Sequence, residues 1–335
     1  MKTPVHIAVL GATGAVGIEV LKTLAKRNFP VGEITLLASE RSAGKTMKFR
    51  GENCGVQLVK PSSFAGVDIA IFSAGAARSS EFAPHAQKAG AVVVDNSSAF
   101  RMDPSVPLVV PEVNGDDVRK HRGIIANPNC SAAIMVVPLW PLHQRAKIRR
   151  IVLSTYQAAS GAGAKAMAEL ESQAKDVLAG KLAQKEVFPH QIAFNVFSHN
   201  TPVAANDYNE EENKIIEETR KMFHEPGLAI CPTCIRVPVM RAHSESIIIE
   251  TECKLAANTA RRILLNAPGV RVVDDRGANY FPMPIEASGQ DEILVGRIRE
   301  DPSGSNSLAM FISGDQLLKG AALNAVQIAE MLLQS

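Results

Sequence analysis

The sequence has no long apolar run and no block of charge of one sign. A membrane-spanning helix needs about 18 consecutive apolar residues, and no such stretch occurs among the 335 residues. The first apolar run, before a glycine loop near the start, is too short for a signal peptide. The net charge is +2 and no run of five Lys or Arg occurs, which argues against a nucleic-acid-binding protein. We therefore expect a cytoplasmic protein with neither a membrane nor a nucleic acid as partner.

Cysteine is scarce as well, with five residues. They are Cys54, Cys130, Cys231, Cys234 and Cys253. An odd number in a chain of this length indicates reduced thiols rather than a disulfide framework. Cys231 and Cys234 have the CxxC spacing, but no second pair or histidine cluster completes a zinc site. We expect no metal, and we interpret both as structural cysteines in a buried strand at 228–239.

The length predicts two domains, at about 100–200 residues each. In the first part, short apolar segments alternate with stretches that can be helical or loop. These segments are 5–10, 34–38, 68–72, 91–94 and 124–126. Such alternation predicts an α/β fold with a doubly wound parallel sheet of the Rossmann type.

After about residue 131 the pattern changes. Longer strands are expected at 151–157 and 246–254, and helical spacing occurs at 165–179 and 210–223. This combination predicts an α+β second domain. An amphipathic helix is expected at 315–333.

The first strand runs into Gly11-Ala-Thr-Gly14-Ala-Val-Gly17 and then a helix. Glycines let a pyrophosphate approach the backbone, and the helix N-terminus provides N–H donors. The spacing GxxGxxG is less specific than GxGxxG, so a purely structural turn is the alternative. We favour a dinucleotide site because the loop lies between a strand and a helix.

The end of the second strand bears on the choice between NAD and NADP. NAD-specific folds place an acidic residue there to bind the ribose 2′-hydroxyl. Here Ser39, Arg41 and Ser42 can bind a 2′-phosphate, with the arginine giving a charge-assisted hydrogen bond. Glu40 would favour NAD if its side chain pointed inward. We expect NADP.

The segment Asn127-Pro-Asn129-Cys130-Ser follows a strand and precedes an apolar helical run. Asn129 is a good N-cap, which would place Cys130 in the first turn of a helix. A helix N-terminus favours the thiolate, and nearby N–H groups can stabilise an oxyanion. The alternative is an inert packed cysteine. Among the histidines, His243 stands out because Arg236 and Arg241 precede it, although a charged surface loop would look similar.

Taken together, these segments resemble the aspartate-β-semialdehyde dehydrogenase family over essentially the whole chain. The matching stretches are GATGAVG (11–17), SERSAGK (39–45), DNSSAFRMD (95–103), VVPEVN (109–114), NPNCS (127–131), STYQAASGAG (154–163), NEEENK (209–214), RVPVMRAH (236–243) and KGAALNAVQIAE (319–330).

The resemblance implies an NADP-binding domain at 1–131, a catalytic and dimerisation domain at 132–311, and a C-terminal helix at 312–335 that returns to the first domain. It also implies a homodimer. It implies the following roles for residues that bind substrate. Cys130 is the nucleophile, His243 the acid/base, Gln157 orients the substrate, Arg236 binds the α-carboxylate, Glu211 the ammonium, and Arg101 and Lys214 the phosphate. The ammonium contact is given to Glu211 rather than Glu210 or Glu212 because of its spacing to Lys214. Without the resemblance, Glu211 and Lys214 would be interpreted as a surface ion pair.

For the cofactor, the resemblance implies two groups of residues. Gly11, Thr13, Gly14, Ala15 and Val16, with Ser39, Arg41 and Ser42, bind the pyrophosphate and the 2′-phosphate. Ser160, Gly161 and Asn324 lie near the nicotinamide.

The implied reaction is the NADPH-dependent reductive dephosphorylation of L-aspartyl-4-phosphate to L-aspartate-4-semialdehyde through a cysteine thioester. This oxidoreductase step is the second in the biosynthesis of lysine and diaminopimelate, methionine, threonine and isoleucine. One alternative is N-acetyl-γ-glutamyl-phosphate reductase, whose thiol motif looks like NPGCY rather than NPNCS. The other is a non-catalytic NADP-binding redox sensor, which would not need Cys130, Gln157, Arg236 and His243 together.

Overall fold

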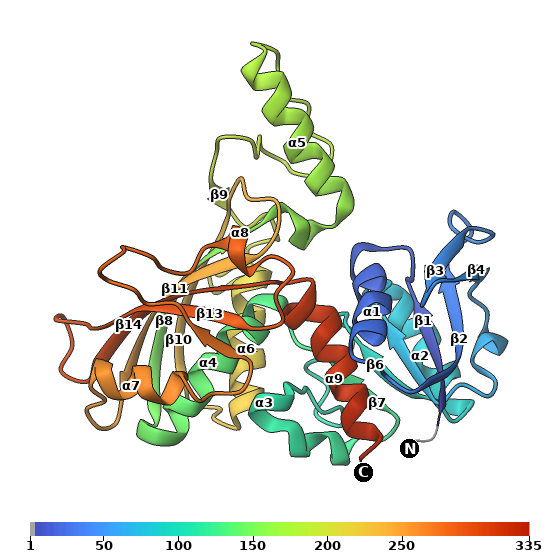
Figure 1. The fold of residues 1–335 in the computed structure, drawn as a ribbon, viewed down its shortest axis with the longest axis horizontal. Helices are drawn as coiled ribbons and strands as arrows, with labels where there is room; N and C mark the ends of the chain where they lie inside the picture. The colour runs from blue at the N-terminus through green and yellow to red at the C-terminus, as the bar shows by residue number, and fades with distance from the viewer. Residues whose placement is uncertain (1–3, 335) are drawn as a thin grey trace. The chain divides into compact units, whose positions relative to one another are not determined.

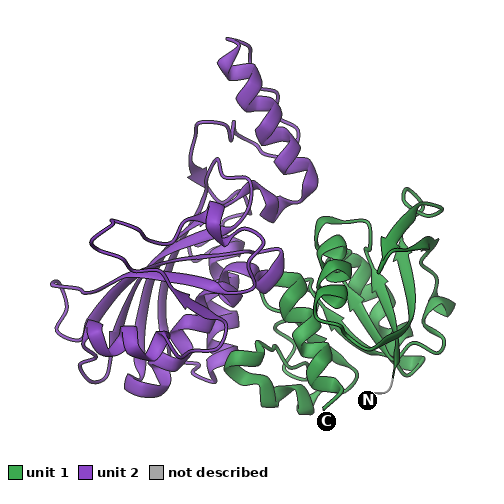
Figure 2. Cartoon of the chain, in the orientation of Figure 1, with its two compact units in different colours: residues 1–129, 321–335 green, residues 130–320 purple. Residues whose placement is uncertain are grey.

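The computed structural model describes residues 4–334, which form two compact units (Figure 2). Unit 1 joins the chain up to Asn129 with the segment that starts at Ala321. Unit 2 is Cys130–Gly320. Each unit is built around one seven-stranded sheet. The domain boundaries after residues 131 and 311 stay predictions.

The sheet of unit 1 has the strand order β3-β4-β2-β1-β5-β6-β7 (Figure 1). Its strands are β1 Val5–Leu10, β2 Val31–Ala38, β3 Thr46–Phe49, β4 Glu52–Leu58, β5 Ile69–Phe72, β6 Val92–Asp95 and β7 Ile124–Ala126. All neighbours are parallel except the hairpin of β3 and β4. The doubly wound parallel sheet predicted from the apolar segments is confirmed. The hairpin was not predicted, because its strands are largely polar and give no apolar signal.

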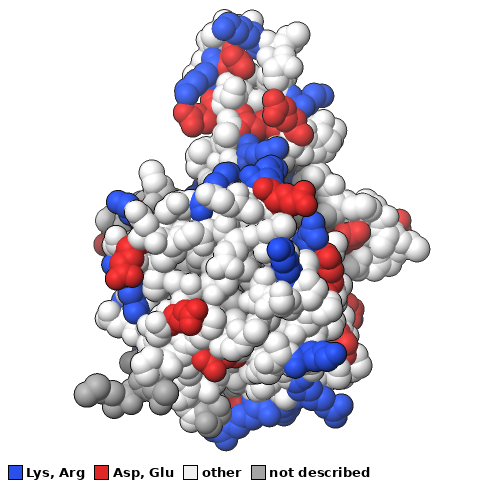
Figure 3. Space-filling view, turned by 90° about the vertical axis from the view of Figure 1, so that its right-hand side faces the viewer, with Lys and Arg blue, Asp and Glu red and all other residues white. Residues whose placement is uncertain are grey.

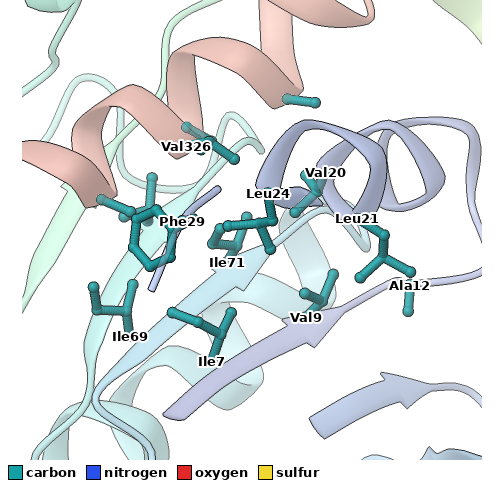
Figure 4. Packing of buried hydrophobic residues seen from close by; sticks show 14 of the residues in the cluster. Ile7, Val9, Ala12, Val20, Leu21, Leu24, Phe29, Ile69, Ile71 and Val326 are labelled. Atoms are coloured by element: carbon teal, nitrogen blue, oxygen red, sulfur yellow. The ribbon is translucent and has the colours of Figure 1, made fainter. Parts of the chain in front are cut away.

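Helices complete unit 1. They are α1 Ala15–Lys26, α2 Ala76–Lys88, α3 Pro111–Asn114, the 3-10 turns η1 Pro61–Phe64 and η2 Gly115–Lys120, and α9 Leu323–Leu332. Leu24 of α1 and Val326 of α9 pack over Ile7 and Ile71 of the sheet (Figure 4). Arg27, just after α1, donates two hydrogen bonds to the Glu330 carboxylate, at 2.7 and 2.6 Å. Through these contacts α9 belongs to the core of unit 1, although it comes last in the chain.

The predicted tail helix at 315–333 begins later than expected. Residues 315–317 are not helical, Leu318–Ala322 form a π-helical turn (η4), and α9 follows. Asp315 explains the delay. Its buried carboxylate accepts hydrogen bonds from Arg241 and from the backbone N–H groups of Gly289 and Leu317, which hold a turn.

The sheet of unit 2 has the strand order β12-β13-β14-β11-β8-β10-β9. The strands are β8 Ile148–Gln157, β9 Phe197–Ser198, β10 Ala229–Arg236, β11 His243–Thr251, β12 Val270–Val272, β13 Ile293–Glu300 and β14 Ser307–Gly314. The helices are α4 Cys130–Ala146, α5 Ala164–Leu178, α6 Glu210–Phe223, α7 Ala257–Leu264 and α8 Pro284–Ala287, with the 3-10 turn η3 Ala159–Ala162. Parallel and antiparallel pairs are mixed, so the predicted α+β character is confirmed.

Strand β10 differs from its prediction as a buried strand. Its residues alternate between exposed and buried, so Cys231 is exposed and Cys234 is buried. The reason is that a strand covered by helices on one face alone buries every second side chain. None of the five cysteines forms a disulfide.

Helix α5 and the loop after it project from the sheet of unit 2 (Figure 1). Along α5 and elsewhere on the face drawn in Figure 3, acidic and basic side chains are intermixed. Large apolar side chains of this region are exposed, namely Leu178, Leu182, Phe194, Val196 and Val203. Within residues 4–334, no helix combines the length and the apolar character that a membrane crossing requires.

Candidate functional site

The glycine loop of unit 1 borders a cavity of about 330 Å³. Its lining residues are Leu10, Gly11, Thr13, Gly14, Ala38, Ser39, Arg41, Ser42, Val59, Ser73, Ala74 and Arg78. Gly11 has φ +86°, and a Cβ there would lie 2.6 Å from the Ser73 carbonyl oxygen, so glycine is required. A Cβ on Gly17 would lie 2.3 Å from the Gly11 carbonyl oxygen. The loop is therefore as compact as a phosphate-binding turn must be.

Helix α1 begins at Ala15, beside this cavity, and no side chain of the described residues caps it. The N–H groups of Ala15 and Val16 in its first turn are oriented as donors to an anion. Ser39, Arg41 and Ser42 line the same cavity, whereas Glu40 is exposed and does not. Arg78, at the start of α2, adds a second positive charge that the sequence did not indicate. The residues present thus fit a dinucleotide with several phosphates.

Two further residues predicted to act in the site lie in unit 1. The Arg101 guanidinium is buried and donates hydrogen bonds to the carbonyl oxygens of Asn127 and Asn96, both at 2.9 Å. The buried Asn324 amide donates to the Val109 carbonyl at 2.8 Å and to the Asn127 side-chain oxygen at 2.6 Å. Asn127 therefore connects the segment of the predicted thiol motif to both residues.

In unit 2, Cys130 is the first residue of α4, as the N-cap position of Asn129 predicted. Its side chain is half-buried. The thiol lies within electrostatic reach of Arg236, since negative charge on Cys130 raises the pKa of that guanidinium. Burial has a larger effect and lowers the Arg236 pKa overall. A Cβ on Gly320 would lie 2.8 Å from the Cys130 Cβ, so the chain passes close to the thiol.

Arg236 and Gln157 are direct neighbours on the parallel strands β10 and β8. Arg236 donates a hydrogen bond from Nη1 to the Ala158 carbonyl oxygen at 3.4 Å, and its buried Nε has no partner among the described residues. Gln157 accepts a hydrogen bond from Thr155 Oγ1 at 3.2 Å and donates one to Glu211 Oε1 at 3.1 Å. The sheet and these bonds fix both side chains in one row.

His243, the first residue of β11, is fully buried. Its Nδ1 accepts a hydrogen bond from the backbone N–H of Ala158 at 3.0 Å. A backbone amide can only donate, so the neutral ring carries its proton on Nε2. Nε2 is buried and has no partner among residues 4–334. Burial first, and then the charge of Arg236, lower the pKa of His243 to about 3, although Glu211 opposes this.

Helix α6 begins with a capping box. The Asn209 side chain accepts the Glu212 N–H, and the Glu212 side chain accepts the Asn209 N–H, each at 2.9 Å. Glu212 also accepts the Cys234 N–H at 2.9 Å, and Glu210 is exposed. Glu211 is buried, bonds to Gln157, and lies 3.8 Å from Lys214 Nζ. Of the three glutamates, Glu211 is the one whose carboxylate meets the row of Gln157 and Arg236.

Ser160 and Gly161 lie in η3, directly after Gln157 and Ala158. The Ser160 hydroxyl accepts a hydrogen bond from the Gln316 side chain. A Cβ on Gly161 would lie 3.0–3.1 Å from the His243 ring and 3.1 Å from Arg236 Nη1, so the two functional side chains converge on this glycine.

His199 also lies with these residues, although no sequence pattern pointed to it. Its ring is within electrostatic reach of Arg236, Glu211, Lys214 and His243. A single histidine in a loop has no sequence signal that distinguishes it from a surface residue. Among the described residues, no cluster of His, Cys, Asp and Glu is suited to hold a metal ion.

Comparison with known proteins shows which families the chain matches. Residues 6–121 match the family model "Semialdehyde dehydrogenase, NAD binding domain", and residues 139–319 match "Semialdehyde dehydrogenase, dimerisation domain". The aspartate-semialdehyde dehydrogenase of Synechocystis is 54% identical over 334 residues, 100% of this chain and 99% of that protein. That of Bacillus subtilis is 47% identical, over 98% and 97% of the two chains.

Solved structures of proteins with the same name are similar to this chain over nearly its whole length. Aspartate semialdehyde dehydrogenase II from Vibrio cholerae, complexed with ASA, is 42% identical and superposes with a TM-score of 0.97 over 99% of both chains. The aspartate semialdehyde dehydrogenase of Candida albicans, solved with NADP, is 25% identical and has a TM-score of 0.76 over 98% of both chains.

Proposed function

This chain belongs to the aspartate-semialdehyde dehydrogenase family, and from that premise we propose that it reduces L-aspartyl-4-phosphate to L-aspartate-4-semialdehyde with NADPH, releasing phosphate. The observation that best supports this reaction is the row of Gln157, Arg236 and His243 beside the thiol at the start of α4. The enzyme thereby serves amino-acid biosynthesis from aspartate.

Cys130 is the nucleophile. Its thiolate attacks the acyl carbon, a C–S bond forms, the C–O bond to phosphate breaks, and phosphate leaves with that electron pair. The first turn of α4 and the nearby Arg236 charge stabilise the thiolate and the oxyanion that precedes the thioester. When bound, the nicotinamide cofactor supplies hydride to the thioester.

We assign the acid/base role to His243, whose neutral ring carries its proton on Nε2 and acts there as a hydrogen-bond donor. The hydrogen bond from Ala158 N–H occupies Nδ1, so Nε2–H is the group available to the reacting atoms. Negative charge on the sulfur or the acyl oxygen strengthens a hydrogen bond from Nε2–H as that charge forms. Burial keeps water away from this bond, which increases its strength.

The charges of the site match the substrate. Arg236 binds the α-carboxylate, Glu211 binds the ammonium, and Gln157 orients the substrate between them while bonded to Glu211. Arg101 and Lys214 bind the phosphate. N-acetyl-γ-glutamyl phosphate is a poor alternative, because an acetylated nitrogen has no charge with which to stabilise the buried Glu211 carboxylate.

The cofactor is NADP. Arg41 and Arg78 provide positive charge in the cavity, Ser39 and Ser42 provide hydroxyls, and Glu40 is outside its lining. Gly11, Thr13, Gly14, Ala15 and Val16 bind the pyrophosphate, and Ser160, Gly161 and Asn324 approach the nicotinamide. The Candida albicans relative was solved with NADP, which supports the choice.

The chain acts as a homodimer in the cytoplasm. Residues 139–319 match a dimerisation domain, and unit 2 exposes large apolar side chains that a second copy can cover. Five cysteines without a disulfide are in keeping with a reducing compartment.

The proposed function is tested by following NADP reduction in the presence of L-aspartate-4-semialdehyde and phosphate. We expect activity that requires phosphate or arsenate, and Cys130→Ala to lower it by at least about 10⁴-fold, the effect typical of losing a covalent nucleophile. Cys253→Ala is the matched control, because that exposed thiol of unit 2 has no part in the mechanism. Activity with N-acetyl-glutamate semialdehyde alone would reject the substrate. NADP binding without any turnover would favour the redox sensor.

A further inference from the structure

His199 is a buried histidine that the mechanism above does not use. It follows β9, the two-residue edge strand, and its backbone N–H donates to the Cys234 carbonyl oxygen at 2.8 Å, continuing the pairing of β9 with β10. Two residues beyond Cys234 on that strand is Arg236. His199 is thus held by the same strand that positions Arg236, and 7% of its surface remains accessible.

Thr201 connects His199 to the first turn of α6. The Thr201 hydroxyl lies 3.1 Å from His199 Nδ1 and accepts a hydrogen bond from the Glu211 backbone N–H at 3.3 Å. The imidazole and the Glu211 backbone N–H are therefore both bonded to one hydroxyl, which places the ring beside the first turn of α6. With Nδ1 engaged in this way, the ring atom left for a ligand is Nε2, which bonds to no group of the described residues.

The surroundings keep this imidazole uncharged. Burial first, then the charge of Arg236 and more weakly that of Lys214, lower the pKa of His199 to about 4, although Glu211 opposes them. At neutral pH the ring therefore has one N–H and one lone pair. In the tautomer that carries its proton on Nδ1, the Thr201 oxygen accepts Nδ1–H as well as the Glu211 N–H through its two lone pairs, and the lone pair of Nε2 is then an acceptor.

The three N–H bonds of a substrate ammonium point in different directions, so a carboxylate on one side of it cannot accept from all three. An ammonium group has three N–H donors, whereas Glu211 Oε1 already accepts from Gln157, and Oε2 lies 3.8 Å from the Lys214 ammonium. A neutral nitrogen acceptor beside Glu211 meets this need without adding a second negative charge. We propose that His199 is a specificity-determining residue that accepts a hydrogen bond from the α-ammonium of the substrate through Nε2.

This inference rests on the proposed function, since the α-ammonium belongs to the substrate assigned there. It is tested with His199→Phe, which keeps an aromatic ring but removes Nε2, and with His199→Gln, which restores an acceptor. Ser198→Ala is the control, because Ser198 is the exposed neighbour on β9. For each protein we would measure binding of L-aspartate and of succinate, which lacks the ammonium, by NMR titration. KM for semialdehyde and for phosphate would be measured in parallel.

We expect His199→Phe to weaken L-aspartate binding and to raise the KM for the semialdehyde by about 10- to 100-fold, the loss typical of one hydrogen bond to a charged group. Succinate binding and the KM for phosphate should change less than about twofold on the same principle. His199→Gln should recover part of the loss, and Ser198→Ala should resemble the unsubstituted protein.

Two results would overturn the proposal. A raised KM for phosphate with an unchanged preference for L-aspartate over succinate would assign His199 to the phosphate. Equal losses for both ligands would make its role structural. If the unsubstituted protein oxidised no semialdehyde, the proposed function would fail, and the two binding titrations would still decide the role of His199.

Discussion

Replacing Glu245 by glutamine is expected to stabilise unit 2 increasingly as the pH rises. Glu245 lies in β11 between Thr155 of β8 and Ile312 of β14, two residues after His243. Its carboxyl group is fully buried, and neither oxygen has a hydrogen-bond partner among the described residues. An ionised carboxylate in such a place is strongly disfavoured. Burial accordingly raises the pKa of Glu245 well above the ordinary 4.5.

The sign of the effect follows from proton binding. Above pH 4.5 the unfolded chain releases the Glu245 proton, while the folded protein retains it until the pH reaches the raised pKa. Stability that is fully present below pH 4.5 is therefore lost as the pH rises toward the folded-state value. The loss is about 1.4 kcal/mol for each pH unit in that window. Glutamine does not titrate, so the stability difference between Glu245→Gln and the unsubstituted protein should grow at this rate.

Trp140 in α4 makes the measurement specific, since it is the single tryptophan of the chain and lies in unit 2. Urea unfolding followed by its fluorescence, at intervals from pH 5 to 8, gives the difference in unfolding free energy. Glu250→Gln is the control, because Glu250 on the same strand is partly exposed and pairs with Arg150. A constant offset between Glu245→Gln and the unsubstituted protein at every pH would refute the reasoning, since the slope and not the offset reports a retained proton.

Two other substitutions test the cofactor pocket and the helix that carries Glu211. Arg41→Ala should lower kcat/KM for NADP by about 10- to 100-fold, as expected for a lost charge-assisted hydrogen bond. The kcat/KM for NAD should stay nearly unchanged. Equal losses with both cofactors would show that Arg41 does not bind the 2′-phosphate. Asn209→Ala removes the N-cap of α6 and should lower the free energy of unfolding, measured with urea, by about 1 kcal/mol. An unchanged unfolding midpoint would show that the capping box is not stabilising.

Local patterns of the sequence were sufficient for much of the fold. Apolar segments and the glycine loop located β1, α1 and most parallel strands of unit 1, because strand, turn and helix propensities are properties of neighbouring residues. The start of α4 at Cys130 was predicted from Asn129 for the same reason. The family followed from many short matching segments spread over the whole chain.

What the sequence determined by itself was thus the order and type of these elements and the residue types available for chemistry. The tertiary structure decided how they meet. Strand pairing placed Arg236 beside Gln157, the Ala158 N–H selected the tautomer of His243, and the capping box left Glu211 to face Gln157. The capping box is local, but the strand pairing, the bond from Ala158 to His243 and the bond from Gln157 to Glu211 join groups far apart in the sequence, so no local pattern records them. The burial of His199 beside the same row arose in the same way, from the pairing of a two-residue strand with β10.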